Sequence, residues 1–259
     1  MKLGSYQVDG INIAYAEYGK GTAGTVVLFS GIIASIKSTF FKQLENLPQR
    51  IIILGRPGYG ETTFFEMEKI LDFAIKLDGF FDSIGVDKFS VVGISAGAPY
   101  AHATAFYFKD RVEKLLIAAG ITEVYKPEHM KLYSKENQEF YQKIEGKTFV
   151  EAGKIVSDIY EKSFNEKSRQ TIDYKDSFQN NCVNLGQEAL LQIKPWGFDI
   201  SEIRCSITFL QGTRDHEVGY QSVIKTTENM SNAKLLIFKF AGHLSIRIYG
   251  RLKSLVKKL

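Results

Sequence analysis

The chain has 259 residues, of which 44% are hydrophobic and 24% are charged, and its formal net charge at pH 7 is +4. This balance is typical of an ordinary globular protein. The two cysteines, Cys182 and Cys205, form no Cys-x-x-Cys pair, so neither a disulfide framework nor a zinc finger is supported. The C-terminal stretch 251–258 concentrates basic residues, and we expect an amphipathic helix with a solvated basic face rather than a nucleic-acid or membrane patch.

The N-terminal sequence MKLGSYQVDG lacks the apolar core of a signal peptide. No apolar run approaches the ~20 residues that a membrane span requires. We therefore expect a cytoplasmic protein without a membrane span.

In chain order, the sequence first predicts β-structure. Residues 5–19 predict a hairpin around Asp9-Gly10, a favoured turn pair. Continuous apolar runs follow at 25–31 and 50–60, with a helical segment at 39–47 between them. Such runs are typical of strands that are buried on both faces of a parallel sheet.

The alternation of strands and helices continues through most of the chain. A helical segment at 67–83 precedes the third apolar run at 88–95, and a helix at 96–108 follows that run. The remaining apolar runs lie at 112–120, 206–212 and 233–242. One helical segment lies between the last two runs, and another follows the last one. This order predicts an α/β fold with a mostly parallel sheet and antiparallel strands at one edge.

One long segment, 121–194, breaks the alternation because it has helical periodicity and no strand-like run. Thr148 and Glu151 form a capping-box pattern that would open one of its helices. About three or four helices fit into this segment. We expect most of its aromatic residues to pack in a helical core and a few to line a pocket.

The sequence Gly93-Ile94-Ser95-Ala96-Gly97 joins the third strand to the next helix. In parallel α/β sheets, ligands bind beyond the carboxyl ends of the strands. A Gly-x-Ser-x-Gly stretch in this context predicts a nucleophile elbow, in which a sharp turn exposes the serine hydroxyl above the sheet. A dinucleotide fingerprint or a phosphate-binding loop is disfavoured, since neither Gly-x-Gly-x-x-Gly nor the required lysine is present. A purely structural turn remains the alternative.

A serine hydroxyl needs a general base, and the chain has four histidines. His243 directly follows the last apolar run and is the predicted base. His216 follows the fifth run and is a second possibility. We expect His102 to pack within the helix after the elbow, and His129 to lie on the surface of the inserted helices.

The base in turn needs a carboxylate that orients it. Asp215 directly follows the fifth apolar run and is the predicted partner. Glu217 lies two residues further on, and Glu123, which follows the fourth run, is the runner-up. Asp199 is expected to cap or tether a loop.

The chain order of Ser95, Asp215 and His243 is that of the α/β-hydrolases, and the chain resembles this superfamily over nearly its whole length. The stretches that carry the resemblance are GISAG, GRPGYGET, FLQGTRDHEV and FAGHLS. The resemblance implies an eight-stranded, mostly parallel sheet with helices on both faces and a helical cap between strands six and seven. The implied domains are a core of residues 1–120 and 200–259 and a cap of residues 121–199.

The resemblance also implies an oxyanion hole. One donor would be the backbone N–H of Ala96. The second would be the backbone N–H of Ile32, in a loop where family members often have His-Gly and this chain has Ser30-Gly31. The loop at 55–60 departs from a frequent Asp-x-x-Gly-x-Gly pattern at its first residue, and we interpret it as structural.

These residues predict a serine hydrolase of the carboxylesterase type that acts on a small to medium apolar substrate. Thioesters, lactones and carbon–carbon bonds next to a ketone remain alternatives to an ester. No cofactor, metal or nucleic-acid partner is expected, and the sequence carries no information on oligomeric state. Activity should fall below about pH 6 to 7, because the base must be neutral.

A different class of function stays open. Some proteins that resemble this superfamily sense a ligand or bind a protein partner and turn over substrate slowly. A purely structural α/β domain would require coincidences at three separate strand ends.

Overall fold

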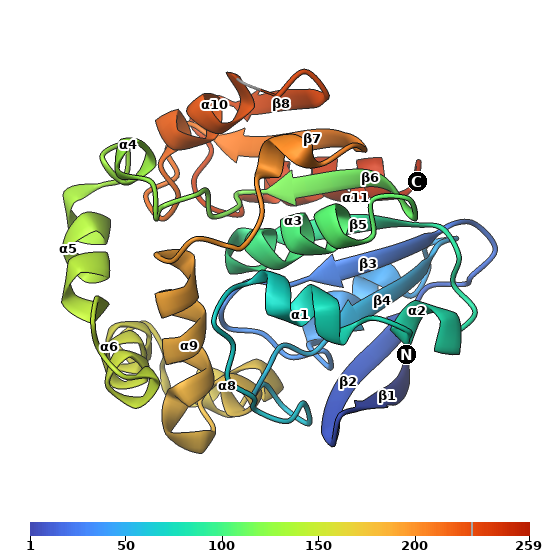
Figure 1. Ribbon diagram of the computed structural model, residues 1–259, viewed down its shortest axis with the longest axis horizontal. Coiled ribbons are helices and arrows are strands. Elements are labelled where there is room, and N and C mark those ends of the chain that lie inside the picture. The colour runs from blue at the N-terminus through green and yellow to red at the C-terminus, as the bar shows by residue number, and fades with distance from the viewer. Residues whose placement is uncertain (229) are drawn as a thin grey trace.

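A computed structural model describes residues 1–228 and 230–259 of the chain. Eight strands form one sheet in the spatial order β1-β2-β4-β3-β5-β6-β7-β8 (Figure 1). β1 pairs antiparallel with β2, β2 pairs antiparallel with β4, and all the other neighbours are parallel. The strand bounds are Lys2–Val8 (β1), Ile11–Tyr18 (β2), Thr25–Phe29 (β3), Arg50–Leu54 (β4), Phe89–Ile94 (β5), Val112–Ala118 (β6), Ser206–Gly212 (β7) and Ala233–Phe238 (β8).

The predicted α/β fold and its edge hairpin are confirmed. Every residue of β5 is buried, because helices cover both faces of the sheet. Alternate residues of the central strands point to two separate cores: Val27 and Val91 pack with the helices of one face, whereas Val26 and Val92 pack on the other. The helices outside the inserted segment are α1 (Leu71–Lys76), α2 (Phe80–Ser83), α3 (Ala98–Tyr107), α10 (Tyr220–Glu228) and α11 (Ile246–Val256).

Two predicted helices differ from the observed ones. The segment 67–83 is divided into α1 and α2, because Gly79 adopts a left-handed φ of +77° between them. The segment 39–47 forms a 3₁₀ helix, Thr39–Leu44, whose first turn is capped by the Ser38 hydroxyl.

Six α-helical segments lie between β6 and β7, where three or four were expected; only α5, α6 and α9 reach ten residues or more. These inserted helices lie beyond the carboxyl ends of the parallel strands (Figure 1). A Cβ added to Gly186 in α9 would lie 1.9 Å from the Phe149 carbonyl oxygen of α6, so this glycine allows the two helices to approach closely. The helices are α4 (Pro127–Met130), α5 (Lys135–Ile144), α6 (Phe149–Glu161), α7 (Glu166–Arg169), α8 (Ile172–Ser177) and α9 (Val183–Gln192).

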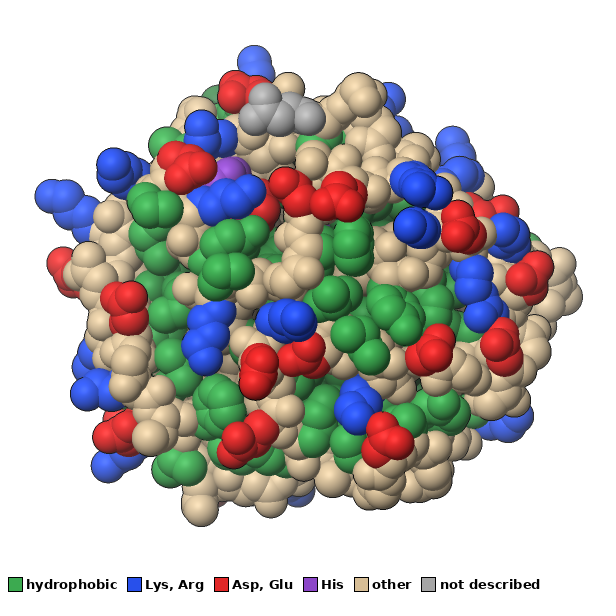
Figure 2. Space-filling model, viewed as in Figure 1, with side chains coloured by type: hydrophobic (Ala, Val, Ile, Leu, Met, Phe, Trp, Pro, Cys, Tyr) green, Lys and Arg blue, Asp and Glu red, His purple; other side chains and the backbone are tan. Residues whose placement is uncertain are grey.

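The basic C-terminal stretch belongs to α11 and the residues just after it. Ile248, Leu252 and Val256 are buried against the sheet, whereas Lys257 and Lys258 are exposed, as an amphipathic helix requires. On the face shown in Figure 2, acidic and basic side chains are interspersed rather than gathered by sign. Among residues 1–228 and 230–259, no helix combines the length and apolarity that crossing a bilayer would require.

Candidate active site

Ser95 lies at the turn that joins β5 to α3. Its φ of +52° is in the left-handed region, which costs a non-glycine residue of order 1–3 kcal/mol and persists only where the surroundings impose it. The flanking glycines create the room for this turn. A Cβ on Gly93 would lie 2.7 Å from the Cβ of Ala101, and one on Gly97 would lie 2.3 Å from the carbonyl oxygen of Phe29. The local sequence therefore permits a tight elbow that places Ser95 at the carboxyl end of the sheet.

The structure brings Ser95, His243 and Asp215 together from three separate strand ends. His243 Nε2 lies 3.0 Å from Ser95 Oγ, and His243 Nδ1 lies 2.9 Å from Asp215 Oδ2. The Asp215 side chain is completely buried, whereas that of His243 is 21% exposed. When Nδ1–H donates to the carboxylate, Nε2 carries the free lone pair and can accept the serine proton.

The carboxylate of Asp215 is fixed by further donors. Gln211 Nε2 donates to Oδ2 at 2.9 Å, and the backbone N–H groups of Glu217 and Val218 donate to Oδ1 at 3.0 and 2.9 Å. A carboxylate held in this way keeps one orientation, which in turn fixes the plane of the His243 ring.

The other three histidines lie away from Ser95. His102 is buried in α3, where its Nδ1 contacts the Ala98 carbonyl oxygen at 2.8 Å, and burial lowers its pKa to about 4. The expectation that His129 lies on the surface is wrong: it is buried, and its Nδ1 lies 3.0 Å from Ser222 Oγ. His216 is exposed.

Of the other acids, Glu217 is exposed and borders the cavity next to Ser95, whereas Glu123 and Asp199 are engaged elsewhere. Glu123 is buried, accepts a hydrogen bond from the Tyr125 hydroxyl and lies 2.8 Å from Lys126 Nζ. The Asp199 side chain accepts from the backbone N–H of Ser201 and caps a short 3₁₀ helix.

A cavity of about 660 Å³ opens above Ser95 and His243, between the sheet and the inserted helices. Its volume is within the range of small-molecule sites. Ile32 and Ala96 line it from the core side, so both proposed oxyanion donors belong to residues that border the same space as Ser95. The other lining residues are Gly31, Ile33, Ile121, Glu136, Asn137, Phe140, Tyr141, Ile159, Tyr160, Ser163, Ala189, Gln192, Glu217 and Leu244.

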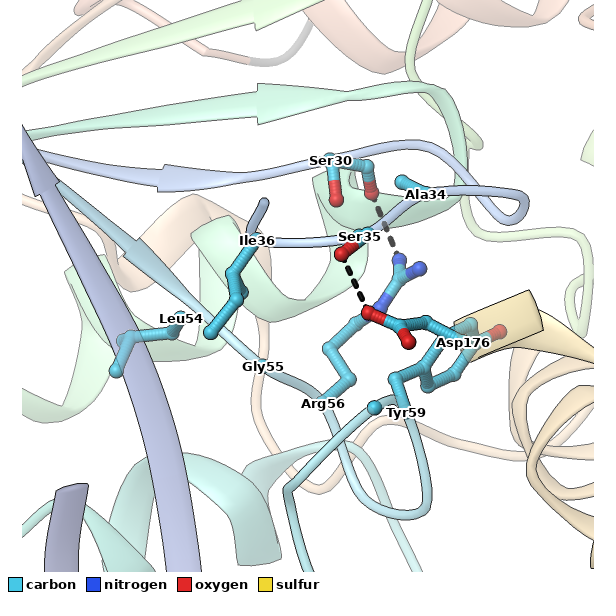
Figure 3. Close-up of a pocket in the computed structure, with 10 residues that line it drawn as sticks. Ser30, Ala34, Ser35, Ile36, Leu54, Gly55, Arg56, Tyr59 and Asp176 are labelled. Atoms are coloured by element: carbon cyan, nitrogen blue, oxygen red, sulfur yellow. Dashed lines mark hydrogen bonds between the residues drawn. The ribbon is translucent and has the colours of Figure 1, made fainter. Parts of the chain in front are cut away.

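Sequence reasoning missed one residue close to this site. Arg56 belongs to the loop 55–60, for which the sequence predicts only a structural role, and the residue is 2% exposed. Its guanidinium donates to the carbonyl oxygen of Ser30 (Figure 3). It also donates to the carbonyl oxygen of Gly31 and pairs with Glu188 of α9. The one signal in the sequence is an arginine two residues after a buried strand, where a buried charge needs a partner.

Comparisons with known proteins extend over nearly the whole chain. The chain is 26% identical over 249 residues to 2-hydroxy-6-oxononadienedioate/2-hydroxy-6-oxononatrienedioate hydrolase 1 of Pseudomonas putida, and the match covers 90% of this chain and 86% of that protein. No family model matches the chain.

Solved structures agree in architecture at low sequence identity. The esterase EaEST from Exiguobacterium antarcticum has a TM-score of 0.73 at 17% identity, with 97% of this chain and 96% of that chain covered. The enol-lactonase from Burkholderia xenovorans LB400 has a TM-score of 0.69 at 16% identity, with 98% of each chain covered. Together with the eight-stranded sheet, these matches confirm the predicted fold: the chain is a protein of the α/β-hydrolase fold.

Proposed function

We propose that the protein is a serine hydrolase that cleaves an ester, or a related acyl bond, of a small to medium apolar substrate. The observation that carries the proposal is the line of hydrogen bonds from Asp215 through His243 to Ser95, which ends in a cavity. The relative that matches 90% of the chain is named a hydrolase, in agreement with this reaction class.

In the proposed mechanism, Ser95 Oγ attacks the substrate carbonyl carbon while His243 Nε2 takes the hydroxyl proton. Asp215 orients the imidazole and stabilises its cation. The tetrahedral intermediate then collapses, and His243 returns the proton to the departing alcohol. A water molecule attacks the acyl-enzyme by the same route and releases the acid.

The negative charge of the tetrahedral intermediate needs donors. We assign this role to the backbone N–H groups of Ala96 and Ile32. Ala96 directly follows Ser95 at the entry to α3, a ten-residue helix whose N-terminal dipole favours an anion.

We assign the inserted helices the role of a cap, residues 121–199, on a core of residues 1–120 and 200–259. Side chains of α5, α6 and α9 form the roof of the cavity over Ser95. Phe140 and Ile159 are apolar members of this roof, which supports an apolar acyl or alcohol group in the substrate.

Cleavage of a carbon–carbon bond next to a ketone is the second candidate, because the Pseudomonas putida relative is named for a dienedioate. A dianionic substrate would be bound best by a lysine or arginine. Among the described residues that line the cavity, the charged side chains other than His243 are the carboxylates of Glu136 and Glu217. The cavity therefore favours a neutral ester over a dicarboxylate.

The direct test is hydrolysis of p-nitrophenyl esters with acyl chains from C2 to C10. Ser95→Ala should lower kcat by about a thousandfold or more, because the nucleophile is lost. Ser254→Ala, in α11, is the matched control and should keep the activity of the natural chain. If the folded natural chain turned over none of these esters, ligand sensing would become the better explanation of the cavity.

A further inference from the structure

The loop that follows β3 carries the Ile32 N–H, and it has no regular secondary structure between residues 30 and 38. Arg56 Nη1 donates to the Ser30 carbonyl oxygen at 2.7 Å, and Arg56 Nη2 donates to the Gly31 carbonyl oxygen at 2.7 Å. One guanidinium therefore holds the two consecutive carbonyl groups that precede Ile32.

This contact determines the direction of the proposed oxyanion donor. The Gly31 carbonyl and the Ile32 N–H belong to one planar peptide group, and in a trans peptide they point in opposite directions. A donor that fixes the carbonyl oxygen of Gly31 therefore fixes the direction of the Ile32 N–H as well. A charged donor on the carbonyl also polarises the peptide and strengthens its N–H as a hydrogen-bond donor.

Arg56 is itself held in place by its surroundings. Its Nη1 lies 2.9 Å from Glu188 Oε1, and both side chains are at most 2% exposed. The guanidinium carbon also lies 4.6 Å from the centre of the Tyr59 ring. Burial has the largest single effect on the pKa of Arg56 and lowers it, but Glu188 together with Tyr59 and Tyr100 raises that pKa above its ordinary value. Because Glu188 belongs to α9, the inserted helices supply the counter-charge.

The far end of the same loop is bound by α8. The backbone N–H of Ser35 donates to Asp173 Oδ1 at 2.8 Å, and that of Ala34 lies 3.0 Å from Ser177 Oγ. The Ser35 hydroxyl also bonds to Asp176, and Figure 3 shows this contact close to the one between Arg56 and Ser30. Two inserted helices therefore reach the loop, α8 directly and α9 through Arg56.

We propose that Arg56, paired with Glu188, is a positioning residue that orients the Gly31–Ile32 peptide as an oxyanion donor and makes that orientation depend on α9. The proposal rests on the proposed hydrolase function of Ser95. An oxyanion contact forms mainly in the transition state, so its loss lowers kcat more than it changes KM.

The test replaces both charges at once, in the double variant Arg56→Met/Glu188→Leu. Removing the two partners together leaves no unpaired buried charge, which is the usual cause of unfolding at such pairs. We expect kcat for the best p-nitrophenyl ester to fall about 10- to 100-fold, which is less than the ~10²–10³-fold loss when a donor is removed outright. KM should change by less than about threefold, and the affinity of a boronic acid that forms a tetrahedral adduct with Ser95 should fall in parallel with kcat.

The matched control is Arg50→Met/Glu17→Leu. This pair joins β4 to β2 at 2.8 Å, and Arg50 also donates to a backbone carbonyl, that of Ile84. Neither residue borders the cavity. The kcat of this control variant should stay within about twofold of the kcat of the natural chain.

Amide hydrogen exchange gives a second readout that does not depend on turnover. Residues 31–38 should exchange faster in the Arg56 double variant and at the natural rate in the control. Unchanged exchange and unchanged kcat would overturn the positioning role even if Ser95→Ala had abolished hydrolysis. If the natural chain did not hydrolyse esters, the exchange result would still decide whether the pair holds the loop. If the double variant failed to fold, Arg56→Lys would replace it, since a lysine keeps the charge but loses the planar fork that binds both carbonyls.

Discussion

At the scale of single residues, the strained backbone conformation of Ser95 exposes its side chain to the cavity. Its positive φ turns the side chain out of the sheet, and Gly93 and Gly97 allow β5, α3 and β3 to pack around it. The cost of that conformation is met by the close packing of these three elements. His243 and Asp215 do not themselves have a positive φ, and they lie in the loops that follow β8 and β7.

His102 gives a prediction about stability and pH. It stacks against Trp196 at 5.9 Å between ring centres, and burial lowers its pKa from 6.5 to about 4. The folded chain keeps this ring neutral while the unfolded chain protonates it, so stability is lost as the pH falls from about 6.5 towards 4. The lowered pKa of His102 corresponds to about 3 kcal/mol in the free energy of unfolding, which is present at pH 7 and lost on acidification to about pH 4.

Denaturant unfolding at pH 7 and pH 4.5 measures this effect. In His102→Phe the loss of stability on acidification should be smaller than in the natural chain by about 2–3 kcal/mol. His216→Gln, at an exposed histidine, is the control and should keep the natural pH dependence. Identical pH dependence in His102→Phe and the natural chain would contradict the account of a buried neutral ring.

At the scale of elements, α6 carries two apolar side chains of similar exposed fraction, one of which lines the cavity while the other does not. Ile159 is 45% exposed and lines the cavity, whereas Val150 is 54% exposed near the start of the same helix and lies outside it. Both positions can take a larger side chain without disturbing the core.

Substitution at these two positions tests whether α6 limits the size of the substrate. Ile159→Trp should lower kcat/KM for the C8 and C10 p-nitrophenyl esters at least about tenfold relative to the C2 ester, because the indole would fill the space above Ser95. Val150→Trp should leave the chain-length profile unchanged. The same profile in both variants would mean that the acyl chain does not reach α6.

At the scale of the whole molecule, the sequence was sufficient to predict the sheet. Its apolar runs end in glycine or polar residues at the point where each strand ends, so the strand order in the chain and the positions of Ser95, Asp215 and His243 followed from local patterns. The eight-stranded fold is confirmed. The structure brings those three side chains within hydrogen-bond distance.

What the sequence could not predict depends on contacts between distant segments. His129 is buried because Ser222 of α10 packs beside it, and a four-residue helix carries no periodicity that would reveal its buried face. The pairing of Arg56 with Glu188 depends on where α9 sits over the sheet, for which the loop 55–60 gives no local signal. The break between α1 and α2 depends on the backbone conformation of one glycine.

The most direct test of the central claim is covalent labelling with a fluorophosphonate, followed by peptide mapping. We expect one adduct, on Ser95, formed in the natural chain and lost in both Ser95→Ala and His243→Ala, because the hydroxyl attacks only when the imidazole accepts its proton. An adduct on another residue, or labelling of Ser95 that did not depend on His243, would contradict the proposal that these residues act together as a nucleophile and its base.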